Sequence, residues 1–275
     1  MFAPLRRHLA PLLGLMLVAT TLSVAAWTSP RTTDDQLELA GCIGYCAYPR
    51  NAGKVFRWGH EKWRYEFETG AFPRKVWKST HPKQIGQQHG MLTIFANKGQ
   101  RKVRTWGTMK AAKYGRWEAR MRAVELAKTG KHFRFIWRLA PVNGTRCNSK
   151  VITLASFRPG DKRVRGAVRT RPSHSFSYAQ GRDLRSRAWH AFAVEVTPTH
   201  ISWFVDTRVV HTERRPAALA GYKLRPEFII KGKKGETMRR SMLQMDWVRH
   251  YTLERKNAKS IKAPRMNKGT YTKGC

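Results

Sequence analysis

Apolar and polar residues alternate with a period of two along short segments from Trp58 to Tyr251, and this pattern constrains the fold more than any other feature. In segment 132–139 every second residue is large and apolar, the apolar set being Phe133, Phe135, Trp137 and Leu139. The other predicted strands are 91–96, 117–124, 151–156, 164–171, 189–196, 201–210 and 242–251. A period near 3.6 residues is not sustained after residue 26. Short strands separated by turns are typical of an antiparallel sandwich, so we predict an all-β fold.

The first 26 residues have the layout of an export signal. Arg6 and Arg7 precede an apolar run at 12–26, which ends in small residues suited to cleavage. We expect export to a secreted or cell-surface location, and membrane contact only through this segment if it stays uncleaved. The signal segment (1–26) is followed by a linker (27–50), a β domain (51–253) and a basic tail (254–275) that we expect to be poorly ordered.

The chain carries a large excess of positive charge. Lys and Arg number 54 against 17 acidic residues, a formal net charge of +37. Such a charge opposes compaction and predicts an anionic partner, which could be nucleic acid, an anionic glycan, a phosphate polymer or an acidic membrane. The hydrophobic share of 41% excludes a disordered chain.

Cys42, Cys46, Cys147 and Cys275 are the four cysteines of the chain. They allow three pairings in an oxidising compartment. We expect Cys42 to be bonded to either Cys46 or Cys275.

Five segments carry a resemblance to a known family, in this order: 114–121 (YGRWEARM), 135–141 (FIWRLAP), 189–198 (WHAFAVEVTP), 201–206 (ISWFVD) and 245–251 (MDWVRHY). Over about residues 58–253 the chain resembles glycoside hydrolase family 16, the group of laminarinases, lichenases and agarases. The resemblance implies a concanavalin-like jelly roll of two antiparallel sheets, preceded here by the signal segment, with a concave sheet that forms a glycan cleft. It also implies retaining hydrolysis of β-linked sugars.

The acids that this activity needs are missing from the matching strand. The family uses a strand that reads Glu-x-Asp-x-(x)-Glu, and retaining hydrolysis needs two carboxylates about 5–5.5 Å apart. The corresponding stretch here is CNSKVITLASFR, residues 147–158, which places Val151 at the nucleophile, Thr153 at the middle acid and Ser156 at the acid/base. Because no Asp or Glu lies between Cys147 and Gly160, we predict that these positions are vacated and that the protein is a pseudoenzyme without catalytic residues.

Arginines follow this strand at alternating positions. Arg163, Arg165, Arg169 and Arg171 would point from an extended chain to one face, neighbours two apart lying about 6.6–7 Å from each other. Guanidinium groups bind carboxylate, sulfate or phosphate in a two-pronged way. A solvated surface is the competing interpretation of these arginines.

The same reasoning extends to further residues that the resemblance places in or beside the cleft. We expect Trp106, which lies in a loop-like context before Gly107, to stack on sugar, whereas Trp137 and Trp203 alternate with apolar residues and should pack in the core. The predicted glycan-binding residues are Arg134, Arg138, Arg163, Arg165, Arg169, Arg171, Trp106 and His132.

Three classes of function therefore compete. The leading hypothesis is an exported, monomeric, non-hydrolytic protein that binds an anionic polysaccharide in an arginine-lined cleft. The second is an active enzyme, either a glycosidase with relocated acids or a polysaccharide lyase that uses His132 or Tyr178 as its base. The third is non-specific binding of nucleic acid or another polyanion. No cofactor is predicted, and no catalytic metal, because His89, His174 and His190 lack a second ligand at metal spacing.

Overall fold

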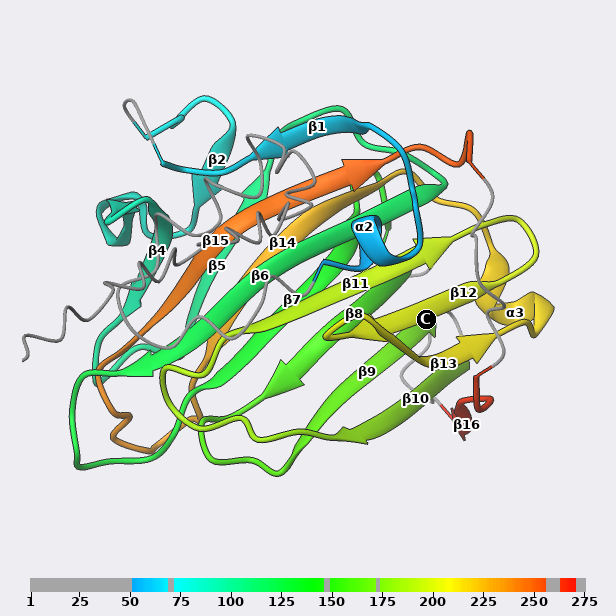
Figure 1. The fold of residues 1–275 in the computed structure, drawn as a ribbon. Helices are drawn as coiled ribbons and strands as arrows, with labels where there is room; N and C mark the ends of the chain where they lie inside the picture. Colours follow the sequence, from blue (N-terminus) through cyan, green and yellow to red (C-terminus); the bar gives the residue numbers. More distant parts are fainter. Residues whose placement is uncertain (1–50, 69–71, 146–148, 172–173, 256–262, 271–275) are drawn as a thin grey trace, which may run out of the picture. The chain divides into compact units, whose positions relative to one another are not determined.

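The computed structural model of the chain describes residues 51–68, 72–145, 149–171, 174–255 and 263–270 (Figure 1). The predicted signal segment, the linker and all four cysteines lie outside the described residues. The described helices are short: α2 (Ala52–Val55), the 3-10 helix η1 (Pro82–Gln84) and α3 (Pro216–Leu219). None of these helices is long and apolar enough to cross a membrane.

Two eight-stranded antiparallel sheets make up the fold, which confirms the predicted all-β sandwich (Figure 1). The first, called the β15 sheet, has the order β13 (Arg208–Glu213), β12 (Ile201–Val205), β11 (His190–Val196), β6 (Gly115–Glu125), β15 (Ser241–Tyr251), β4 (Met91–Ala96) and β3 (Ile85–Gln88), with β1 (Glu61–Tyr65) also paired to β15. The second, called the β8 sheet, has the order β16 (Asn267–Thr270), β10 (His174–Gly181), β9 (Arg163–Thr170), β8 (Lys150–Phe157), β7 (Arg134–Pro141), β14 (Leu224–Lys231), β5 (Lys102–Gly107) and β2 (Trp77–Ser79).

The apolar side of each sheet forms the core between them. All four apolar residues of the 132–139 alternation are completely buried, and so is Trp203. The prediction that Trp137 and Trp203 pack in the core is therefore confirmed. Each strand of the β8 sheet turns its alternate residues to the opposite side, which we call the outer face.

The structure differs from the sequence prediction in several places that matter for the sheets. The strands β5, β10 and β14 of the β8 sheet lie outside the predicted strands. Residues 201–210 form not one strand but the hairpin β12–β13, because Asp206 and Thr207 adopt left-handed φ angles of 48° and 71° and reverse the chain. Residues 267–270, assigned above to the tail, form β16 and pair with β10, so the β8 sheet extends beyond residue 253.

Candidate functional site

Val151, Thr153 and Ser156, the positions predicted to have lost the catalytic acids, lie in the middle of the β8 sheet. Ladder pairing places Trp106 of β5, Glu227 of β14, Arg138 of β7, Thr153 of β8 and Ala167 of β9 in one row across the outer face. β7, β8 and β9 follow one another in sequence, but β5 and β14 come from distant parts of the chain, so the row exists only once the sheet has formed. It brings predicted sugar-binding side chains beside the predicted catalytic strand.

A bulge in β8 explains how Thr153 and Ser156 can share a face although they are three residues apart. The pairing of β8 with both neighbours shifts register between these residues. The side chains of Val151, Thr153 and Ser156 are half-buried, whereas Ile152 and Leu154 are buried in the core. The extra residue restores the outward direction at Ser156. The strand thus presents valine, threonine and serine to the outer face.

Glu227 is the single carboxylate side chain within the eight described strands of the β8 sheet. Its side chain is 0% exposed and lies between two guanidinium groups. Arg104 Nε donates to Oε2 at 2.6 Å, and Arg138 Nε donates to Oε1 at 2.7 Å. We call these three residues the Glu227 cluster. Glu227 lies two strands from β8, and its hydrogen bond holds Arg138 in place.

The predicted arginine ladder is largely present on β9. Arg163, Arg165 and Arg169 are exposed on the outer face, where Arg165 pairs with Ser156 and Arg169 with Val151 across the ladder. Arg171 follows the last residue of β9 and is half-buried. The residues of β10 opposite the ladder are small, namely Ser175, Ala179 and Gly181. The three arginine side chains therefore have small side chains next to them on β10, which leaves room for a ligand along β9.

Trp106 belongs to β5 and not to a loop, which corrects the sequence prediction. Its half-buried ring lies 5.0 Å from the guanidinium carbon of Arg104 and 5.6 Å from that of Arg225, measured to the ring centroid. Both contacts are within the range of cation–π attraction. Burial, followed by repulsion from Arg104, lowers the pKa of Arg225. The ring is thus surrounded by positive charge in the same row as Thr153.

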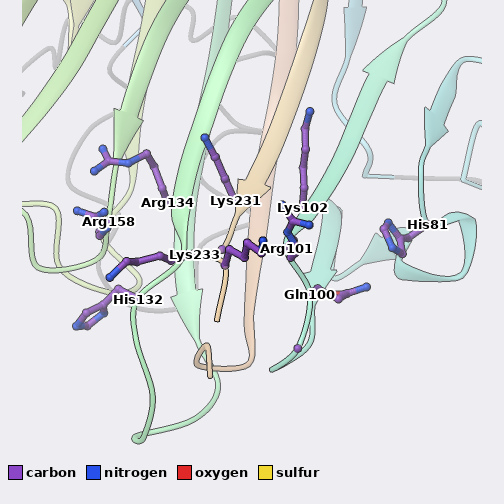
Figure 2. A pocket seen from close by; sticks show the side chains of 12 residues that line it. His81, Gln100, Arg101, Lys102, His132, Arg134, Arg158, Lys231 and Lys233 are labelled. Atoms are coloured by element: carbon purple, nitrogen blue, oxygen red, sulfur yellow. The ribbon is translucent and has the colours of Figure 1, made fainter. Parts of the chain in front are cut away.

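A cavity of about 950 Å³ opens where β5, β7 and β14 meet their loops (Figure 2). Lys102, Lys231 and Arg134 line it from the three neighbouring strands. We call it the cationic pocket. Arg134 Nη1 also donates to Ser156 Oγ at 3.4 Å, so the pocket adjoins the position predicted for the acid/base. Sequence reasoning selected Arg134 but missed both lysines, because their strands are separated by more than a hundred residues.

His132, another predicted site residue, lies at the edge of this pocket. Its Nδ1 is hydrogen-bonded to Oε1 of Glu125, which also binds Arg239 through Oε2. His132 is thereby connected to an acid outside the outer face, and it lies apart from Trp106 and Thr153.

Tyr178, the other base considered for a lyase, is not on the outer face. The side chain lies in the core, 4% exposed, and its hydroxyl donates to the carbonyl of Leu154. Burial raises the pKa of Tyr178 far above its ordinary value. A sugar on the outer face therefore cannot reach this hydroxyl, and this part of the lyase hypothesis is wrong.

The comparisons with known proteins find the fold but not a close relative. No family model and no curated protein sequence matches this chain. A laminarinase catalytic domain from Thermotoga petrophila is 17% identical with a TM-score of 0.56, over 71% of this chain and 98% of that one. SCLam, a non-specific endo-β-1,3(4)-glucanase from family GH16, is 14% identical with a TM-score of 0.57, over 70% and 91%.

A longer protein also matches. The GlcNAcα1-4Gal-releasing endo-β-galactosidase from Clostridium perfringens is 14% identical with a TM-score of 0.55, over 70% of this chain. The match covers 62% of that enzyme, so this chain spans less than two thirds of its length. The predicted resemblance to glycoside hydrolase family 16 is thus confirmed for the jelly-roll fold.

Proposed function

We propose that this protein, whose fold is the jelly roll of glycoside hydrolase family 16, is exported and binds an anionic polysaccharide on the outer face of the β8 sheet without cleaving it. Similar structures include a laminarinase and an endo-β-1,3(4)-glucanase, which supports a glycan as the ligand. The signal-like segment at residues 1–26 supports export.

The observation that carries the proposal is the replacement of the acids on β8. Retaining hydrolysis needs a nucleophile and a proton donor about 5–5.5 Å apart. Val151 cannot form an ester with a sugar, and the Ser156 hydroxyl is a poor acid at neutral pH. Glu227 cannot fill both roles, because both of its oxygens accept hydrogen bonds from guanidinium groups.

The charge of the outer face supports an anionic ligand over a neutral one. Every described strand of the β8 sheet except β10 contains Lys or Arg. Glu227 is the one acid in these strands. Arg163, Arg165 and Arg169 repeat along β9 with a spacing that suits charges repeated along a chain. An anionic chain supplies a counter-charge beside these guanidinium groups, which a neutral sugar does not.

The test compares binding and cleavage in the same preparation. We expect the full chain to bind polygalacturonate but not laminarin in isothermal titration calorimetry, and to release no reducing ends from either. Arg163→Gln with Arg165→Gln should weaken polygalacturonate binding about tenfold, since two exposed ion contacts contribute roughly 0.7 kcal/mol each. Lys62→Gln with Arg208→Gln is the matched control, because both residues are exposed on strands of the β15 sheet.

Three results would contradict the proposal. New reducing ends would show a glycosidase, and new ultraviolet absorbance from unsaturated uronates would show a lyase. Equal losses of affinity in the two double variants would show attraction to overall charge alone. In that last case duplex DNA and polygalacturonate should also be released alike as salt rises.

A further inference from the structure

The cationic pocket concentrates like charges that the fold itself does not neutralise. Lys231 of β14 lies directly opposite Lys102 of β5 on one side and Arg134 of β7 on the other. Residues opposite each other in an antiparallel ladder have their Cβ atoms about 4.5–5.5 Å apart, and like charges at such positions are destabilising. Figure 2 shows the three side chains on neighbouring strands at the pocket.

The same strands show how the fold treats cations elsewhere. Four residues before Lys231 on β14, Glu227 accepts hydrogen bonds from Arg104 and Arg138 and balances their charge. Lys231 also points to the outer face of β14, but it adds a positive charge between Lys102 and Arg134. The middle of β14 therefore carries its own counter-charge, whereas its last residue needs a counter-charge from outside.

Loops add more positive charge around this row. Arg101, Arg158, Lys233 and Lys234 also line the cavity, and none of the described residues in its lining is Asp or Glu. The acids nearby offset part of this charge: Glu236 pairs with Lys233 at 3.0 Å, Glu125 contacts His132, and Asp161 and Glu227 act on Arg134 and Lys102 through their charges. Within the described residues, none of these acids forms an ion pair with Lys102, Lys231 or Arg134.

The charges in the pocket act on one another. Burial, and then the charge of Arg138, lowers the pKa of Lys102. Burial, and then the charge of Arg158, lowers the pKa of Arg134. Both shifts mean that the charged forms of these side chains are less favourable here than in water, which an anion in the pocket would reverse.

We propose that the cationic pocket binds a ligand that carries two or more phosphate groups. A phosphate ester has a charge of about −1.5 to −2 and three acceptor oxygens, so that one group can bridge cations of adjacent strands. A carboxylate has two oxygens, which suit a single guanidinium fork, whereas lysines bind phosphate as point charges. A cavity of about 950 Å³ can hold a sugar with its phosphates.

For a phosphorylated glycan this inference rests on the proposed function, because the polymer would reach the pocket along the outer face. The same chemistry also fits a free polyphosphate. Titration calorimetry of the full chain with inorganic tripolyphosphate, glucose 1,6-bisphosphate and citrate distinguishes these ligands. We expect the affinity for each phosphate compound to be at least about tenfold higher than the affinity for citrate. Tighter binding of the sugar bisphosphate indicates a glycan source, and tighter binding of tripolyphosphate a free one.

The double variant Lys102→Gln with Lys231→Gln tests whether these two lysines bind the phosphate ligand. We expect the affinity of this variant for tripolyphosphate to be at least about tenfold lower than that of the wild type. The control Lys62→Gln with Arg208→Gln should keep the wild-type affinity. The pocket variant should also unfold at a higher temperature than the wild type without ligand, because a repulsive pair is gone. Tripolyphosphate should raise the unfolding temperature of the wild type and not that of the pocket variant.

Equal binding of citrate, or equal losses in the two double variants, would overturn the inference. These outcomes are separable from those of the proposed function, since tripolyphosphate is titrated without any glycan. Polygalacturonate binding without tripolyphosphate binding rejects the pocket alone. The reverse result rejects the proposed function and leaves the pocket.

Discussion

Neutralising Glu227 should destabilise the protein more than neutralising any exposed acid. Glu227→Gln keeps the size of the side chain but removes the negative charge that two guanidinium groups contact. Breaking a fully buried ion pair costs roughly 3–5 kcal/mol, because the remaining charge stays desolvated. The side chains of Arg104 and Arg138 are 31% and 28% exposed and can turn partly to water. We therefore expect the free energy of unfolding to fall by about 2–3 kcal/mol.

The measurement is urea unfolding at pH 7, followed by tryptophan fluorescence and extrapolated to water. For a domain of this size the expected loss corresponds to a decrease in Tm of roughly 5–10 °C. Glu236→Gln is the matched control, because Glu236 pairs with Lys233 at the surface. We expect this control to leave the urea midpoint unchanged.

A double-mutant cycle identifies the cause. Once Glu227 has lost its charge, Arg138→Gln removes one of the two unbalanced cations and should cost less than it does in the wild type. The combined loss should therefore be smaller than the sum of the single losses. If Glu227→Gln unfolds at the urea midpoint of Glu236→Gln, or if the two changes simply add, the Glu227 cluster does not stabilise the sheet electrostatically.

Two further predictions concern the core. Burial, and then the charge of Lys62, lowers the pKa of His250 from its unfolded value of 6.5 to about 4. Between these pH values the unfolded chain binds more protons than the folded chain. The free energy of unfolding should therefore fall by about 3 kcal/mol as the pH decreases from 6.5 to 4. His250→Gln should flatten this dependence in urea unfolding at several pH values, and an unchanged slope would rule His250 out. A Cβ at Gly166 would lie 2.0 Å from the ring of Tyr178, so Gly166→Ala should lower the free energy of unfolding by about 2 kcal/mol. Gly181→Ala, where no atom lies within 4 Å, should not, and equal effects would contradict the packing argument.

Much of the sheet structure could be predicted from sequence, because burial imposes a period of two on each strand. The alternation at 132–139 gave both the strand and its buried face. The same rule, applied to 174–181, would have shown that Tyr178 shares the core-facing side with Phe176, and would have removed it as a candidate base. The hairpin at 206–207 was missed because Asp-Thr is not one of the glycine-containing turns that mark such reversals.

The order of the strands could not be predicted in this way. Glu227 meets Arg104 and Arg138 across 123 and 89 residues of sequence, because β14 inserts between β5 and β7. No local pattern encodes that insertion. The cationic pocket depends on the same insertion, since it brings the end of β14 between the starts of β5 and β7.

The distribution of acids between the two sheets explains why one face is so strongly positive. The strands of the β15 sheet contain Glu118, Glu195 and Glu213, all buried, and the last two pair with arginines. The β8 sheet has Glu227 alone, and that acid is already balanced. Most acids of the described strands thus lie in the β15 sheet, and the strands of the β8 sheet keep an excess of cations. A long anion approaching the protein would be attracted to this face. The cations of β5, β7, β9 and β14 lie on the same sheet as the strand where we predict that the catalytic acids are replaced, so the proposed absence of hydrolysis and the proposed anion binding concern one surface.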